Sequence, residues 1–398
     1  MERDETAAMP GITKTPGKII LQKENPPHLP RDNKRQKPRP LTILFSILAL
    51  IALIHFIAAA HTATHPAQTV NCTSLLRTTD YSHIVQFHPQ DQEISGIQFI
   101  NEITGATPSV LVQVTDKGPQ QRLDVYVYGC NTQQSKTALT LLFKMQGLIQ
   151  GSASMSQAHT LSISQLDTTL PQSEEVLMQP LQQNIYREYI WHNGMFIQTE
   201  FPGLYPVLSR SEAEALQDQA NNGQNLPWSD PLITAEQMAK DIFHWPGHDP
   251  QDRVQDNNGS IAHVFLFQPE LQMKVRVTLE RLIQHGRQGL WFVTDAQTAG
   301  ILLDKAALPL PADSPITLKG AMSQPAGQMS IQLFTHTLTP LHVLNNGAPG
   351  VQANGNFTGI IPYTTTIADQ PGLLLIEDTP GAGSNQPGHL LLTHLILG

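Results

Sequence analysis

The sequence lacks the local motifs that mark common catalytic and nucleotide-binding sites. It contains no Gly-x-Ser-x-Gly, the pattern that holds a nucleophilic serine on a strand-to-helix turn. Gly381-Ala382-Gly383 is not followed by Lys-Ser/Thr, so it does not form a phosphate-binding loop. Serine, histidine and aspartate are scattered along the chain, which leaves a catalytic triad without support from the sequence. We therefore predict no catalytic residue, no metal site and no cofactor.

Charged side chains are also scarce, and their signs are unevenly distributed. They make up 14 % of the 398 residues, against 40 % hydrophobic residues, and there are 30 prolines and 27 glycines. Residues 1–40 hold nine Lys/Arg against five Asp/Glu, which leaves 15 against 28 in the rest of the chain. An acidic folded part argues against nucleic acid as a partner. The composition favours β structure over helix.

The long apolar run is Leu41–Ala60, which contains no charged residue. At about 1.5 Å per residue, a helix of this length spans roughly 30 Å, the thickness of a bilayer's hydrocarbon core. Basic residues directly precede it, and by the positive-inside rule they keep the N-terminus in the cytoplasm. The sequence thus predicts a single-pass cell-membrane protein with an exported C-terminal part. The alternative is a signal peptide cleaved after Ala58-Ala59-Ala60, which would release a secreted protein.

The chain divides at this run into a tail, a membrane span and an ectodomain. Seven prolines and little apolar periodicity predict a disordered, basic cytoplasmic tail at 1–40. A transmembrane helix (41–60) and a spacer (61–71) follow. The ectodomain is predicted to have three parts: an antiparallel β domain (72–207), an α+β domain (208–303) with two helices and three strands, and an immunoglobulin-like β-sandwich (304–398). The predicted class is mainly β with an α+β middle domain.

Cysteine is nearly absent, since the chain holds only Cys72 and Cys130, both on the predicted exported side. Two isolated cysteines are too few for a thiolate metal site, whereas an even pair in an exported protein is typical of one disulfide. This bond would close a loop of about 60 residues and stabilise the fold by roughly 3–4 kcal/mol. Lipidation of Cys72 is not expected, because Thr69-Val70-Asn71 lacks the small residues that lipoprotein processing requires.

Period-2 alternation predicts the strands of the first ectodomain part. Val110, Val112 and Val114 alternate with other residues, and the same pattern recurs at 123–127 and 161–163. A short apolar run at 139–143 adds another strand. These strands should form one antiparallel sheet domain. Asn193-Gly194 predicts a tight hairpin between strands at 186–191 and 196–198.

In the middle part, the period-2 alternation gives way to residues that mark the start of helices. Ser211 with Glu214, and Thr234 with Gln237, read as capping boxes that open two helices. Asn221-Asn222-Gly223 and Pro246-Gly247 should end them. Alternation at 273–280, with apolar runs at 263–267 and 290–293, predicts three strands. The helices are expected to cover one face of that antiparallel sheet.

The last part carries strand patterns at 316–318, 329–334, 357–363, 373–377 and 390–397. Ser314-Pro315-Ile316-Thr317-Leu318-Lys319-Gly320, Gly355-Asn356-Phe357 and Gly372-Leu373-Leu374-Leu375 resemble the immunoglobulin-like domain associated with bacterial spore germination. The resemblance covers roughly residues 313–398, and Leu341–Ala353 is an insertion relative to it. It implies a non-catalytic β-sandwich in a bacterial envelope protein, and it carries no catalytic residues. The whole chain also resembles uncharacterised membrane-anchored bacterial proteins.

One segment gathers the residue types that bind metals. His244, His248, Asp249 and Asp252 lie close together in the sequence. The two histidines are spaced like neighbours on a helix face, but Pro246-Gly247 breaks any helix between them. A solvated loop is therefore the preferred interpretation.

Three aromatic residues, Trp191, Tyr205 and Trp228, lie near turns or prolines. Exposed aromatic side chains make good contact surfaces, so these residues could line a groove for a peptide or glycan. A joint between domains, packed with rigid rings, is the simpler interpretation. Both interpretations place these residues where the first two ectodomain parts meet.

The predicted function is a membrane-anchored extracellular binding or scaffolding protein of the cell envelope, with an envelope protein or a glycan as its partner. The acidic charge balance, the modular β pattern and the missing catalytic motifs lead to this prediction. The alternative is an exported hydrolase with a site around Trp191, Tyr205 and Trp228. An accessory subunit of an envelope complex is a third interpretation.

Overall fold

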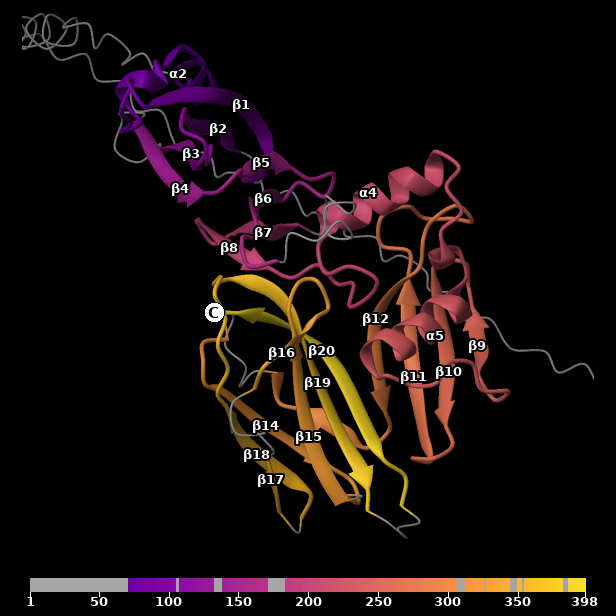
Figure 1. The fold of residues 1–398 in the computed structure, drawn as a ribbon. Coiled ribbons are helices and arrows are strands. Elements are labelled where there is room, and N and C mark those ends of the chain that lie inside the picture. The colour runs from indigo at the N-terminus through magenta and orange to yellow at the C-terminus, as the bar shows by residue number, and fades with distance from the viewer. Residues whose placement is uncertain are drawn as a thin grey trace, which may run out of the picture. The chain divides into compact units, whose positions relative to one another are not determined.

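The computed structural model describes residues 71–398, except for 105–106, 132–137, 171–182, 306–311, 326, 344–348, 353 and 382–385. The predicted tail, the apolar run and all but the last residue of the spacer lie outside these described residues. Within the described part, no helix combines the length and the apolarity that crossing a membrane requires. This part is mainly β and consists of several antiparallel sheets, as the sequence predicts (Figure 1).

The first sheet has four antiparallel strands in the order of the chain. They are β1 (Gln92–Thr104), β2 (Thr107–Asp116), β3 (Leu123–Asn131) and β4 (Ala138–Leu148). Helix α2 (Cys72–Thr78) and the short 3₁₀ helix η1 (Tyr81–His83) cover one face. Leu76 of α2 and Tyr81 of η1 pack against three valines of β2. These are the valines that the period-2 alternation predicts on one face, Val110, Val112 and Val114. The predicted strands at 110–114, 123–127 and 139–143 are thus confirmed.

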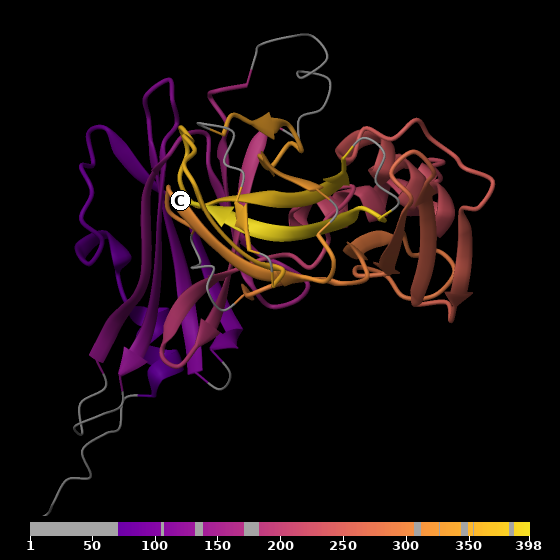
Figure 2. The same ribbon diagram turned by 90° about the horizontal axis from the view of Figure 1, so that it is seen from below.

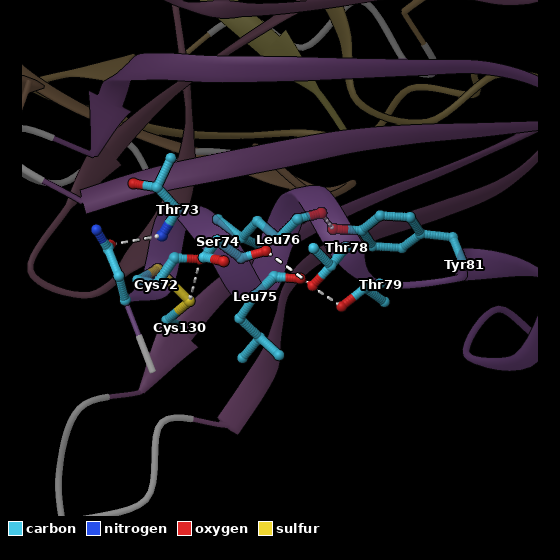
Figure 3. The surroundings of a disulfide bond; sticks show 10 residues. Cys72, Thr73, Ser74, Leu75, Leu76, Thr78, Thr79, Tyr81 and Cys130 are labelled. Carbon is cyan, nitrogen blue, oxygen red and sulfur yellow. Dashed lines mark hydrogen bonds between the residues drawn. A yellow bond between two sulfur atoms is a disulfide. The ribbon is translucent and has the colours of Figure 1, made fainter. Parts of the chain in front are cut away.

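A disulfide joins α2 to β3. Figure 3 shows Cys72 at the start of α2 bonded to Cys130, so the predicted disulfide is confirmed. The sequence predicts only β structure from residue 72 onwards, and α2 is a correction to that prediction. The side chain of Asn71 caps α2 by accepting from the N–H of Thr73 at 3.1 Å, and Leu76 anchors it to the sheet.

The second sheet is also antiparallel and four-stranded. Its strands are β5 (Ser152–Met155), β6 (Leu161–Leu166), β7 (Asn184–His192) and β8 (Met195–Thr199). The two sheets share an apolar core, in which the ring of Phe143 on β4 lies 4.9 Å from that of Tyr189 on β7. The sequence predicts one sheet domain for this region, whereas the structure divides its strands between two sheets.

Helix α4 (Arg210–Asn221) begins two residues earlier than the sequence predicts. Its N-cap is Ser209 and not Ser211. The Ser209 hydroxyl donates to Oε2 of Glu212 at 2.6 Å and accepts from the N–H of Glu212 at 3.2 Å. The Ser209–Glu212 pair has the spacing of the predicted capping box, and Ser209 makes the N-cap bond of that motif. The predicted stop at Asn221-Asn222-Gly223 is confirmed.

Helix α5 (Pro231–Ile242) also begins before its predicted start. Asp230 is the N-cap, and its carboxylate accepts from the N–H groups of Leu232 and Ile233. Pro231 occupies the first turn, where a missing N–H costs nothing. Thr234, the predicted cap, is buried inside the helix. Figure 1 shows α5 lying across β10 (Ile261–Gln268) and β11 (Met273–Glu280).

The largest sheet has eight strands and joins the middle part of the ectodomain to the last part. Its order is β16-β15-β19-β20-β12-β11-β10-β9, with β9 (Arg253–Asn257), β12 (Phe292–Thr298), β15 (Gly327–Phe334), β16 (Pro340–Leu341), β19 (Gln370–Pro380) and β20 (His389–Leu397). Ala296 on β12 pairs with Leu392 on β20. The sheet therefore runs across the boundary that the sequence places at 303–304.

A further four-stranded sheet packs on part of this large sheet. It contains β13 (Ile301–Leu303), β14 (Ile316–Met322), β17 (Gly350–Val351) and β18 (Asn356–Ile361) in the order β13-β14-β18-β17. Leu318 and Phe357 share a core with Leu374 of β19 and Leu395 of β20. Figure 2 shows β19 and β20 of the large sheet side by side. All five strands predicted for the last part are present.

Candidate functional site

The structure brings Tyr205 and Trp228 together. Their rings lie 5.2 Å apart in an edge-to-face arrangement. Tyr205 is only 3 % exposed, and its hydroxyl donates to Oδ2 of Asp241 on α5 at 2.6 Å. The carbonyl of Trp228, on the 3₁₀ helix η2 (Pro227–Ser229), accepts from the N–H of Trp291 at 2.8 Å. The two rings fill a packed joint beside α5.

Trp191 lies apart from these two rings, in the hairpin of β7 and β8. Asn193 and Gly194 form its turn with φ angles of 49° and 89°, the positive values that an Asn-Gly hairpin turn requires, so this predicted hairpin is confirmed. The ring of Trp191 packs against Phe196 at 5.1 Å, and Phe196 packs against Phe143 of β4 at 5.5 Å. The first sheet thus covers this face of the hairpin.

The other face of the hairpin is apolar and exposed. Side chains alternate along a strand, so the neighbours of Trp191 and Phe196 point away from the covered face. Ile190 and Ile197 pair across the two strands and are 39 % and 41 % exposed, while Met195 is 58 % exposed. We call these three residues the hairpin face. The alternation around Trp191 could have identified it from the sequence.

The edge of the second sheet lies beside the hairpin face. β8 is an outer strand in the order found for the described residues, and Met195–Thr199 contains no charged residue and no proline. Charges and prolines are the features that usually keep a further strand from pairing with an edge. The hairpin therefore combines exposed apolar side chains with an outer strand that carries neither charge nor proline.

A small cavity lies between the second sheet, the N-terminus of α4 and the end of β20. Its volume is about 20 Å³, which is room for about one water molecule. Four of its lining residues carry a buried polar atom without a hydrogen-bond partner among the described residues: Nη1 of Arg187, Oε2 of Glu188, Oε1 of Glu200 and Nε2 of His394. No pattern in the sequence joins His394 of β20 to the other three residues, which come from the β7–β8 hairpin and the residue after it.

Hydrogen bonds fix the walls of this cavity. Oε1 of Glu188 accepts from Oγ1 of Thr160 at 2.6 Å and from Nε of Arg210 at 2.7 Å. Arg187 donates from Nε and Nη2 to the carbonyls of Asp369 and Ala368, at 3.0 and 2.7 Å. The cavity thus lies where the second sheet is bonded to the loop before β19.

Burial favours the uncharged forms of two ionisable groups in the cavity. It raises the pKa of the Glu200 carboxyl, and it lowers the pKa of the His394 imidazole to about 4. Acid–base catalysis uses such groups, but only where a substrate can reach them. A volume of about 20 Å³ is far below the roughly 300 Å³ or more of ligand pockets. The geometry is that of a structural joint.

Two residues of the segment that gathers metal-binding residue types, for which the sequence favours a solvated loop, meet a third residue that the sequence does not single out. One ligand atom each from Glu236, His248 and Asp252 lies within 4.8 Å of the other two. Nδ1 of His248 is 2.6 Å from Oε1 of Glu236, which lies on α5. His244 is exposed and does not join this group. Glu236 could not be recognised as a ligand from the sequence, because the residues around it indicate only a helix.

No protein-family model matches the chain, and no curated protein sequence matches it significantly. Its function must therefore be inferred from its own residues and contacts.

Proposed function

We propose that the chain is a membrane-anchored binding or scaffolding protein of the bacterial cell envelope, and that the hairpin face contacts its partner. The observation that carries the binding role is the exposed aliphatic surface of Ile190, Met195 and Ile197 beside the edge of β8. Exposed apolar patches mark contact sites for other proteins, and an edge strand can pair with an added strand. The partner is therefore a protein segment that reaches this edge in an extended form.

A glycan partner fits this surface less well. The aromatic rings of the hairpin, Trp191 and Phe196, are packed against the first sheet and are not free to stack on a sugar. Tyr205 is buried in a different joint. The exposed side chains are aliphatic and offer no hydrogen-bonding group, which suits an apolar protein surface.

The proposed location rests on the sequence and on the disulfide. Leu41–Ala60 has the length of a membrane span, and the basic residues before it place the N-terminus in the cytoplasm. A disulfide such as Cys72–Cys130 forms and persists in oxidising compartments, which fits an exported ectodomain. A retained anchor is proposed over cleavage near Ala60. The α+β unit at 208–303 and an immunoglobulin-like module at 304–398 belong to the same proposal.

The topology can be tested by protease protection. We expect protease added to intact spheroplasts to remove a C-terminal tag from the full chain while an N-terminal tag survives, because only the C-terminal part is outside. The control is the same chain without Leu41–Ala60, whose C-terminal tag should be protected. A protected C-terminal tag on the full chain contradicts the proposal, and a mature N-terminus near His61 supports secretion instead.

The contact surface can be tested by substitution. Ile190→Lys combined with Ile197→Lys should weaken partner binding at least about tenfold, equivalent to about 1.4 kcal/mol, by placing charges on the hairpin face. The melting temperature should change little, because both side chains are partly exposed. The measurement is the yield of a cross-linked adduct in cells from a photoreactive residue at position 195.

Ile360→Lys is the matched control for this experiment. Ile360 is also an exposed isoleucine on a strand, 65 % exposed on β18, but it lies outside the hairpin face. Its substitution should leave the adduct unchanged. An adduct that persists in the hairpin double variant, or that Ile360→Lys removes equally, contradicts the assignment of the contact surface.

One observation favours the second candidate, an exported hydrolase. Glu188, Glu200 and His394 line the same cavity, and such groups can act as acids and bases. Trp191, Tyr205 and Trp228, which the sequence suggests for a hydrolase site, pack outside this cavity. A substrate could therefore reach Glu188, Glu200 and His394 only if the cavity opened. If it does, Glu200→Gln abolishes hydrolysis of peptide or glycoside substrates without unfolding the protein. A native chain that hydrolyses neither class removes this candidate.

A further inference from the structure

Glu236, His248 and Asp252 come from α5 and from the segment that follows it. Glu236 lies near the middle of the helix and is partly buried, His248 lies in the loop that follows, and Asp252 lies immediately before β9. Their ligand atoms lie within 4.8 Å of one another. Two atoms that bind one ion at about 2 Å each lie up to about 4 Å apart, so small side-chain rotations would bring these three atoms to ligand distances.

The loop reverses direction after α5 so that His248 returns to the helix. Phe243 and Trp245 anchor it, with ring centres 5.3 Å apart in the core beneath α5. His244 and Gly247 have positive φ angles of 56° and 108°, which make the reversal. The position of His248 is therefore set by packed rings and backbone turns.

Asp252 is the most firmly held of the three residues. It is nearly buried, and its two carboxylate oxygens accept from the N–H groups of Asp249 and Phe267, both at 2.8 Å. Each carboxylate oxygen has two lone pairs, so each retains one for another contact. Hydrogen bonds of this kind orient carboxylate ligands in metal sites.

We propose that Glu236, His248 and Asp252 bind a Zn²⁺ ion that fastens the loop at 243–252 to α5. One imidazole and two carboxylates are ligands that Zn²⁺ accepts, whereas Ca²⁺ and Mg²⁺ prefer oxygen atoms alone. His248 is exposed, so water can complete the coordination. The site does not depend on the function proposed above.

Protons compete with the metal at this site. Zn²⁺ binds only the neutral imidazole, so it must displace the proton that an imidazole carries in acidic solution. Zn²⁺ affinity should therefore fall as the solution becomes mildly acidic.

The test is a calorimetric titration of Zn²⁺ into the full chain, purified without a histidine tag in detergent. At about pH 7.5 we expect one ion per chain and a higher melting temperature, and at about pH 5.5 an affinity weaker by at least about tenfold. Co²⁺ in place of Zn²⁺ should give visible absorption bands from the site. Mg²⁺ at the same concentration should bind far more weakly.

Substitutions assign the site. His248→Gln and Glu236→Gln should each weaken Zn²⁺ binding at least about tenfold. His263→Gln is the matched control, because Nδ1 of His263 forms a similar pair with Asp256 at 2.7 Å, and no third described ligand joins that pair. Melting in EDTA verifies the fold of each variant. Absence of stoichiometric binding to the native chain, or binding that survives His248→Gln and Glu236→Gln, overturns the proposal.

Discussion

Replacing Cys72 and Cys130 with alanine is expected to lower the free energy of unfolding by about 3–4 kcal/mol. The bond spans 58 residues, and in the chain-entropy model a cross-link of this length restricts the unfolded chain by about that amount. It also fastens α2, a helix of only seven residues that would not be stable alone. The Tyr81 hydroxyl, which donates to the carbonyl of Leu76 at 2.8 Å (Figure 3), is a buried polar contact that remains near its end.

Urea denaturation measures this loss, and limited proteolysis locates it. New cleavage should begin within residues 72–91, because the segment that covers β2 and β3 is released first. The native chain treated with a reductant is the control, and it should show the same lower stability. A double variant that loses less than about 1 kcal/mol, or that is cleaved first elsewhere, contradicts this account of the bond.

Features that depend on neighbouring residues could be predicted from the sequence. The burial of β11 alternates from Met273 to Glu280 as its pattern requires, and Asn193-Gly194 forms the predicted turn. The helix starts were misplaced although stronger signals were present. Asp230-Pro231 is a better start than Thr234, since a capping carboxylate is followed directly by a proline in the first turn.

Pairings between distant segments could not be predicted. The contact of Ala296 with Leu392 joins strands that no local pattern relates, and it makes one sheet out of two predicted parts. The same holds for the candidate sites. His248 and Asp252 could be noticed together, but Glu236 meets them only because the loop folds back over α5. Trp191 is one of the aromatic residues that could line a groove, but the exposed side chains of its hairpin are Ile190, Met195 and Ile197.

The stability of the fold is expected to fall as the pH rises above about 6.5, and Glu212 is the main reason. This residue is fully enclosed at the start of α4, and burial raises the pKa of its carboxyl to about 8, although the hydrogen bond from Ser209 lowers it. The ordinary value of 4.5 applies in the unfolded chain. Between these two values the folded state holds a proton that the unfolded state has released.

The sign of the effect follows from this difference in bound protons. The contribution of Glu212 is fully present below about pH 4.5 and declines by up to about 1.4 kcal/mol per pH unit until about pH 8. The free N–H groups at the start of α4 favour the carboxylate and reduce the total loss. His394 acts in the opposite direction, because its lowered pKa of about 4 removes stability as the pH falls below 6.5. The two effects together place the greatest stability in mildly acidic solution.

Glu212→Gln is expected to remove most of this loss at alkaline pH. Glutamine keeps an oxygen that can accept from Ser209, and it stays neutral at every pH. At about pH 5 the variant should therefore resemble the native chain, and at about pH 9 it should be more stable by several kcal/mol. The measurement is the free energy of unfolding by urea across this range. Glu270→Gln, on an exposed turn, is the control and should leave the profile unchanged. If the native chain and Glu212→Gln lose stability equally as the pH rises, Glu212 is ionised in the folded protein, and the N-terminal amides of α4 outweigh its burial.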